Sequence, residues 1–298
     1  GRVLGSHGGI DSFLAHREGA LGFSRRFMVK VVREGDGCTP LALERILYEA
    51  RLGMHLAHPN LLPILDLDRA DGCLFLLREW VDGFGLRALL NARGSSTSGL
   101  PRTAVLRIGI GVCQALSYLH DLQLPPWAPE GLAHRGVSPS NILVGRSGDV
   151  RLANLFTARA CGSNASRSHE PADEPSLIPA YSAPEVRAGL PTASTADTFS
   201  LGVVLVEALS NSAALGGSTD SDWTRTRDRE VLSATLHSLD LGDELVDLLS
   251  RCIQDDSSHR PDEVHQVEEL LRRSLRDRHH SQGSKALRSL VREQPSPA

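Results

Sequence analysis

Residues 133–144, with the sequence AHRGVSPSNILV, bring an imidazole, a guanidinium and a carboxamide close together in the chain, at His134, Arg135 and Asn141. Gly136 directly follows the arginine and has no side chain, so it can neither accept a proton nor orient a nucleophile. Asn141 is uncharged, whereas Mg²⁺ in proteins is bound mainly through carboxylates and phosphates. The stretch therefore contains polar groups but no carboxylate that could act as a general base or as a charged metal ligand.

Two oppositely charged residues lie nearer the start of the chain. Lys30 is part of residues 26–32, a β-like run with the sequence RFMVKVV. Glu49 lies within residues 41–56, whose apolar side chains recur at helical spacing. An ion pair between Lys30 and Glu49 would serve catalysis or would simply hold the helix to the sheet, and the sequence leaves both interpretations open.

Arg78 directly follows the apolar run LFLL at residues 74–77. A buried guanidinium requires a carboxylate or several carbonyl groups. Glu49 is a candidate partner, and Arg78 would then compete with Lys30 for it. The alternative, in which Arg78 turns outward to solvent, stays open at this point.

Three motifs in the second half of the chain are expected to form the elements that position the polar side chains described above. They are PAYSAPE at residues 179–185, DTFSLG at 197–202 and CIQDDSSHRP at 252–261. In this order and at these spacings they resemble the eukaryotic-like, bacterial-type serine/threonine protein kinases. The resemblance covers about residues 3–274 and includes the HRD-like stretch at His134.

The resemblance implies an α+β fold with two lobes, a small antiparallel β-sheet carrying one helix and a mostly helical second lobe. The expected boundaries are residues 1–80 for the N-lobe and 81–274 for the C-lobe. Residues 275–298 are rich in arginine and lysine, and we expect a solvated tail or linker there. A site for an anionic membrane or partner in this segment is the alternative.

The resemblance also implies structural roles for polar residues of the large lobe. Asp197 is expected to bond to the backbone around His134 and Arg135. Glu185 and Arg260 are expected to form an ion pair.

Several positions depart from the family pattern. Gly136 replaces the aspartate that accepts the substrate proton, Ser138 replaces a lysine that steadies the transferred phosphate, and Asn154 replaces the metal-binding aspartate. Gly53 replaces a bulky apolar residue, so we expect a gap in the hydrophobic column there. The retained functional positions are Lys30, Glu49 and Asn141.

The resemblance places a nucleotide site at Gly5, Met28, Lys30, Arg78 and Leu143. Only the first glycine of the phosphate-covering loop is kept, and Met28 stands where a small residue normally leaves room for adenine. Burying a methionine is favourable by roughly 1.5–3 kcal/mol, so it would tend to fill that space itself. ATP and Mg²⁺ are the cofactors that the resemblance implies, and the substitutions weaken the expectation for both.

The sequence therefore predicts a pseudokinase-like binding or regulatory module. The alternative is a divergent, active serine/threonine kinase that transfers the γ-phosphate of ATP to protein hydroxyls. Residues 161–178 correspond to the activation segment, and their acidic residues are candidates to pair with Arg135 in place of a phosphate. These are Glu170, Asp173 and Glu174.

Composition narrows the choice of partners. The net charge of −4 gives no sign of nucleic-acid binding, so we expect protein partners in signalling.

Five scattered cysteines without C-x-x-C spacing favour a reduced, cytoplasmic setting. No apolar run reaches the length of about 18 needed to span a bilayer, and no signal peptide opens the chain. Because the first residue is Gly1, we expect a longer protein, and a membrane connection only through flanking segments.

Overall fold

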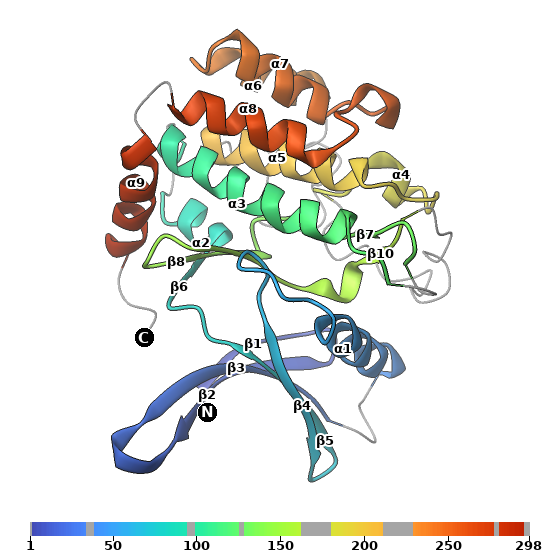
Figure 1. Ribbon diagram of the computed structural model, residues 1–298, viewed down its shortest axis with the longest axis vertical. Coiled ribbons are helices and arrows are strands. Elements are labelled where there is room, and N and C mark those ends of the chain that lie inside the picture. Colours follow the sequence, from blue (N-terminus) through green and yellow to red (C-terminus); the bar gives the residue numbers. More distant parts are fainter. Residues whose placement is uncertain are drawn as a thin grey trace. The chain divides into compact units, whose positions relative to one another are not determined.

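The computed structural model describes the residues 2–33, 39–93, 99–124, 128–161, 180–210, 229–276 and 280–294. The chain forms two compact units (Figure 1). Unit 1 comprises Gly1–Asp82 together with Asn154–Phe156, and unit 2 comprises Gly83–Ala153 and Thr157–Ala298. Unit 1 is built on an antiparallel sheet and unit 2 is mostly helical, which confirms the predicted α+β fold class.

Unit 1 contains a five-stranded antiparallel sheet with the strand order β1-β2-β3-β5-β4. The strands are β1 (Arg2–His7), β2 (Ile10–Glu18), β3 (Ser24–Arg33), β4 (Ile64–Ala70) and β5 (Cys73–Glu79). Buried and less buried residues alternate along β5, because successive side chains of a strand point to opposite faces. Leu74, Leu76 and Arg78 share the buried face, so the strand pattern itself carries a guanidinium into the core.

Helix α1 (Pro40–Gly53) covers the buried face of this sheet. The Thr39 hydroxyl accepts a hydrogen bond from the Ala42 amide at 3.2 Å, and Pro40 occupies the first turn, where its missing N–H costs nothing. Ile46 and Ala50 of α1 pack on the core residues of β3 and β5. The helix begins and ends close to the predicted limits.

The expected gap at Gly53 is absent. A Cβ atom built on Gly53 would lie 2.3 Å from Cδ1 of Ile64, so the β4 side chain already fills the space. The glycine permits a close approach between α1 and β4 rather than leaving a void.

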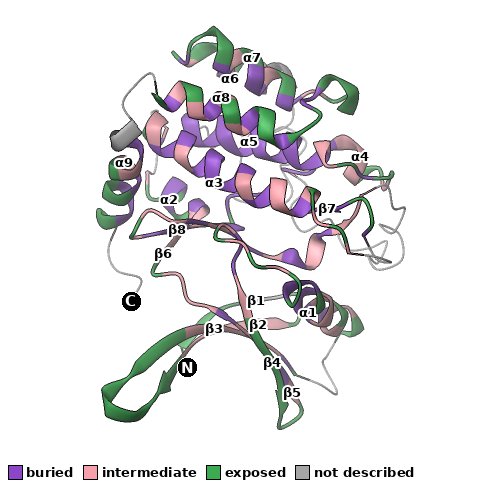
Figure 2. Ribbon diagram, viewed as in Figure 1, coloured by how far each residue is buried: buried purple, intermediate pink, exposed green. Residues whose placement is uncertain are grey.

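Unit 2 is built around two long helices, α3 (Arg102–His120) and α5 (Thr195–Ser210). Every residue of α5 from Ala196 to Leu209 is buried, as the purple ribbon in Figure 2 shows. The other helices are α2 (Leu86–Asn91), α4 (Pro184–Arg187), α6 (Arg229–Ser238), α7 (Asp243–Cys252), α8 (Val264–Arg276) and α9 (His280–Arg292). None of the described helices is both long enough and apolar enough to cross a membrane.

Short strands of unit 2 carry the stretch that opened the sequence analysis. They are β6 (Gly83–Gly85), β7 (Leu132–Ala133), β8 (Ile142–Gly145), β9 (Val150–Leu152) and β10 (Arg159–Ala160). β6, β8 and β9 form one antiparallel sheet, and β7 pairs with β10. The loop at residues 134–141 therefore begins at the end of β7 and ends at the start of β8.

The C-terminal segment differs from the expected solvated tail or linker. Residues 280–292 form α9, whose Leu287, Leu290 and Val291 are buried where the helix packs on α3 and β8. The Arg288 guanidinium also donates a hydrogen bond to the Ser147 carbonyl oxygen at 2.8 Å. The prediction rested on the basic residues and missed the apolar side chains that lie between them. These apolar side chains belong to the core of unit 2.

Candidate functional site

Asp197 of α5 fixes the backbone of the loop at residues 134–141. Its carboxylate accepts hydrogen bonds from the amides of His134 and Arg135, each at 2.7 Å, and lies 2.9 Å from Nε2 of His120. The carboxylate is fully buried, so these donors are its compensation for lost hydration. Arg135 has a φ of 61°, a left-handed conformation that is unfavourable for arginine and is held by these contacts.

Two titratable groups, His134 of this loop and Asp197 of α5, have lowered pKa values. Burial lowers the pKa of His134, because the charged imidazolium would be poorly solvated, although the charge of Asp197 opposes the shift. For Asp197, burial alone would raise the pKa. The hydrogen bond and charge of His120 and the charge of His134 outweigh it, so the pKa lies below its ordinary value.

These shifts predict that acid destabilises the domain in two steps. Between the unfolded pKa of His134, about 6.5, and its lower folded pKa, the unfolded chain binds more protons than the folded one. The stabilising contribution is therefore complete above about pH 6.5 and is lost as the pH falls. The contribution of Asp197 is lost in the same direction, below its ordinary pKa of 3.8. Urea unfolding from pH 8 to about pH 2 covers both steps, and His134→Gln should flatten the first one. A stability that stays constant down to pH 5 would contradict the argument.

Gly136 lies where the resemblance places a catalytic aspartate, and its surroundings are already filled. A Cβ atom on Gly136 would lie 2.5 Å from Oγ1 of Thr157. That hydroxyl donates a hydrogen bond to the His134 carbonyl oxygen at 2.9 Å, and Nδ2 of Asn141 donates to the Gly136 carbonyl oxygen at 2.7 Å. The position therefore lacks a base and also lacks room for one. Sequence reasoning did not identify Thr157.

The remaining predicted positions of unit 2 are close to this loop in the chain. Ser138 is fully buried, and its hydroxyl has no hydrogen-bond partner among the described residues. Leu143 lies on β8, paired with Gly85 of β6 and Arg151 of β9. The proposed pairing of Arg135 with Glu170, Asp173 and Glu174 involves residues outside the described part of the chain.

In unit 1, the carboxylate of Glu49 contacts both of its predicted partners, Lys30 and Arg78. Oε2 of Glu49 accepts a hydrogen bond from Nζ of Lys30 at 2.9 Å, and Oε1 pairs with the Arg78 guanidinium. Oε1 also accepts the backbone amide of Leu155 at 3.1 Å. Arg78 is therefore buried and shares Glu49 with Lys30, and the alternative of an outward-turned guanidinium does not hold.

The segment Asn154–Phe156 completes this cluster. Oδ1 of Asn154 accepts hydrogen bonds from Nζ of Lys30 at 2.9 Å and from Nη1 of Arg78 at 3.3 Å. The Phe156 ring lies 5.3 Å from Nζ of Lys30 and 5.6 Å from the guanidinium carbon of Arg45, which are cation–π distances. Each residue of the segment thus makes its own contact with the charged groups of unit 1.

Lys30 and Arg78 share the single carboxylate of Glu49, and this sharing affects the pKa values of both cations. Burial lowers the pKa of Lys30 well below its ordinary value, and the positive charge of Arg78 lowers it further. Burial also lowers the pKa of Arg78, to about 9, which leaves the guanidinium charged at neutral pH. Glu49 therefore serves two buried groups whose pKa values are both lowered, and it is their shared counter-charge.

The donor groups present do not fit a Mg²⁺ ion. The oxygen of Asn154 already faces two cationic groups, which would repel a divalent cation, and Asn141 directs its amide nitrogen inward as a donor. In the described ranges no group of three or more His, Cys, Asp or Glu side chains is arranged to hold a metal ion.

Two further residues of the predicted nucleotide site are on the sheet of unit 1. Gly5 lies on the exposed β1, and Met28 lies on β3 opposite Arg78.

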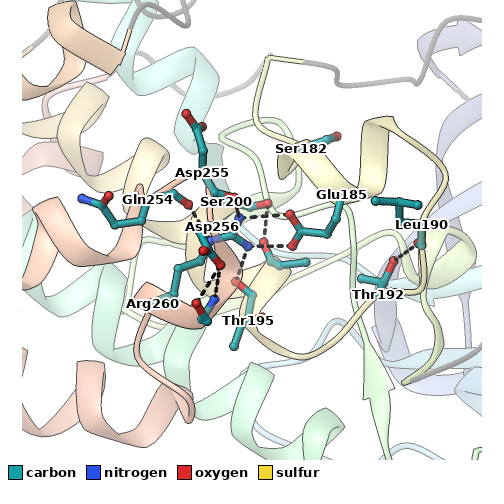
Figure 3. A network of polar contacts seen from close by, with 12 residues as sticks. Ser182, Glu185, Leu190, Thr192, Thr195, Ser200, Gln254, Asp255, Asp256 and Arg260 are labelled. Carbon is teal, nitrogen blue, oxygen red and sulfur yellow. Dashed lines mark hydrogen bonds and ion pairs between the residues drawn. The ribbon is translucent and has the colours of Figure 1, made fainter.

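Arg260 and Glu185 form a bidentate ion pair in unit 2 (Figure 3). Nη1 and Nη2 of Arg260 lie 2.6 and 3.0 Å from the two carboxylate oxygens. The buried guanidinium also donates to the carbonyl oxygens of Gln254, Asp255 and Thr195 at 2.7, 2.8 and 3.3 Å. This network joins the start of α4, the start of α5 and the segment that follows α7.

A third buried charge cluster was not predicted. Glu207 of α5 accepts hydrogen bonds from Arg87 at 2.7 Å and from the Tyr181 hydroxyl at 2.6 Å. Burial and then the charge of Glu207 raise the pKa of Tyr181 well above its ordinary value, so the hydroxyl is a donor. A glutamate within the otherwise apolar run at residues 201–209 was the sequence signal, because a buried carboxylate requires partners.

Comparison with known proteins shows which family has this architecture. The family model described as protein kinase domain matches residues 22–274. The chain belongs to the protein kinase family. This kinase-family chain is 31% identical over 235 residues to the tyrosine-protein kinase MasK of Myxococcus xanthus, covering 79% of the chain and 35% of MasK. It is 25% identical over 229 residues to the serine/threonine-protein kinase PknD of Chlamydia pneumoniae, covering 70% of the chain and 23% of PknD.

Solved structures support the fold of the kinase-family chain. The PknI kinase domain of Mycobacterium tuberculosis, as its C20A mutant, superposes with a TM-score of 0.62 at 24% identity. The match covers 92% of this chain and 93% of the PknI chain. The chain spans about a third or less of the length of MasK and PknD.

Proposed function

We propose that this kinase-family domain does not transfer phosphate at a kinase-like rate and acts as a protein-binding module in signalling. The observation that carries the proposal is Gly136 with Thr157 beside it, which removes the base and occupies its space. A positioned acid–base group contributes about 10²–10⁴ in rate. Kinases turn over at roughly 1–100 s⁻¹, so this single loss makes turnover marginal.

The charged cluster of unit 1 supports the same proposal. Arg78 holds Glu49 through a buried ion pair, and Asn154 gives its oxygen to Lys30 and Arg78. Groups that would otherwise be available to nucleotide phosphates and metal are thus engaged with one another. The charged groups of the cluster thus satisfy one another without a ligand.

We also place the domain in the cytoplasm with protein partners. The described cysteines Cys73, Cys113, Cys161 and Cys252 are free thiols, which suits a reducing compartment. The kinase relatives support signalling partners, and the net charge of −4 disfavours nucleic acid.

A divergent active kinase is the second candidate. It is favoured by the Lys30–Glu49 contact of 2.9 Å, by the presence of Asn141 and by relatives that are named as kinases. This candidate requires a base other than residue 136.

A thermal-shift titration with ATP, with and without Mg²⁺ or Mn²⁺, separates the two candidates. A ligand at 100 times its Kd adds about 2.7 kcal/mol of stability, which is an easily measured shift. We expect no metal-dependent shift, and no transfer of ³²P from γ-labelled ATP to the chain or to a generic protein substrate. A metal-dependent shift together with labelled serine or threonine would establish the second candidate.

Gly136→Asp in the same assay tests whether the missing base is the sole defect. We expect no labelling, because the new carboxylate collides with Thr157 and metal-binding groups are still missing. Gly136→Asp/Thr157→Ala provides room for the carboxylate and should also stay at background. Labelling by either variant would show that the nucleotide and metal sites are intact and that the proposal overstates the loss.

A further inference from the structure

Strands β2 and β3 continue beyond the sheet of unit 1 as a two-stranded ribbon, residues 15–27. β1 pairs with β2 only as far as Leu14, and β5 pairs with β3 only as far as Phe27. Beyond these limits the two strands pair only with each other among the described residues, down to Glu18 opposite Ser24. Figure 1 shows the ribbon as the blue hairpin that projects from the sheet, and Figure 2 shows that its outer part is exposed.

The tip of the ribbon is apolar. Leu21 and Phe23 have exposed fractions of 107% and 62%. Leu21 also has a φ of 57°, in the left-handed region that a Cβ atom makes unfavourable. Single exposed apolar residues are common in soluble proteins. Here two of them share a projecting tip, and one is held in an unfavourable backbone conformation.

Cations lie directly behind the tip, and they face one another across the ribbon. Arg17 is opposite Arg25, and His16 is opposite Arg26. Like charges in directly opposite positions destabilise a strand pair. Neither Arg17 nor Arg25 forms an ion pair with any described acidic residue. The Arg25 guanidinium lies 5.4 Å from the Phe27 ring, a cation–π contact that leaves its positive charge without an anion.

We propose that this ribbon binds an anionic lipid surface. Leu21 and Phe23 enter the boundary between headgroups and acyl chains, and Arg17 and Arg25 lie level with the anionic headgroups. Apolar burial and electrostatic attraction act together in interfacial binding of this kind. An acidic polypeptide would satisfy the cations but leave the tip exposed, and a second ribbon would bring arginines against arginines. The proposal uses none of the residues of the buried clusters and is independent of the proposed function.

Cosedimentation with lipid vesicles tests the proposal on the whole chain. We expect binding to vesicles of phosphatidylcholine mixed with phosphatidylglycerol, no binding to phosphatidylcholine alone, and weakening by salt. Arg17→Gln/Arg25→Gln should lower the association constant by roughly fivefold for each cation removed. Leu21→Gly/Phe23→Ser should lower it by on the order of tenfold, and glycine accepts the left-handed φ, so the turn is retained.

Matched variants remove similar groups elsewhere. Lys285→Gln/Arg292→Gln removes two exposed cations of α9, and Leu190→Ser removes an apolar side chain that is 53% exposed. Both should bind vesicles as the wild type does, with unchanged melting temperatures for all variants. The proposal fails if the wild type does not bind anionic vesicles, or if the α9 variant loses binding equally. It also fails if the ribbon instead binds polyglutamate, or forms a dimer that Leu21→Gly/Phe23→Ser abolishes, without binding vesicles.

Discussion

Glu49→Gln is expected to lower the free energy of unfolding by about 3–5 kcal/mol, because it leaves a buried cation without its counter-charge. The Arg78 guanidinium is 1% exposed and has Glu49 as its carboxylate partner, while its other described side-chain contact is the neutral Asn154. The Leu155 amide would also lose a charged acceptor. Urea unfolding measures the total loss, and hydrogen exchange of the α1 amides assigns it to unit 1.

Two further variants separate the charge effect from simple loss of packing. Glu49→Leu/Arg78→Leu removes both charges and should regain most of the lost stability, because an apolar pair can replace a buried ion pair at little cost. Glu269→Gln breaks the exposed pair with Arg273 and should change little. If Glu49→Gln costs no more than Glu269→Gln, the cluster is not structural.

Asp197→Ala should produce the second large loss, about 3–5 kcal/mol, in unit 2. It leaves the buried amides of His134 and Arg135 without an acceptor, and each unsatisfied buried donor costs about 1–3 kcal/mol. The histidine at position 120 loses its partner as well. Equilibrium unfolding gives the magnitude, and faster amide exchange at residues 134–136 shows where the loss occurs.

The isosteric change Asp197→Asn refines this second test. One amide oxygen can still accept a hydrogen bond, but the new NH₂ group faces a donor, so we expect an intermediate loss. Asp256→Ala is the matched control, since that carboxylate is exposed and bonds only locally to Ser258. Equal effects of Asp197→Ala and Asp256→Ala would contradict a role for the buried carboxylate in holding the loop.

The sequence predicted the features that the family resemblance specifies. The resemblance placed Arg78 at the nucleotide site, and the two-residue period of β5 places its guanidinium in the core. The resemblance also paired Glu49 with Lys30, and the structure shows that contact. The kinase motifs predicted the α+β architecture, which the family match and the fold confirm.

The rest depended on packing between distant parts of the chain. Nothing local to Gly136 indicates that Thr157, many residues later, occupies its side-chain space, and nothing local to Gly53 indicates Ile64. The division of Glu49 between two cations likewise follows from where α1 and β5 meet. Substitution patterns show which groups are missing, whereas coordinates show what has taken their place.

Helix α9 extends the folded domain beyond the boundary of the family match. The family match stops at residue 274, yet Leu287 and Val291 lie in the interior of unit 2 beyond that limit. A fragment cut at the family boundary would leave the apolar side of α3 facing water, which favours aggregation. The unit that packs together therefore extends beyond the family boundary and includes α9.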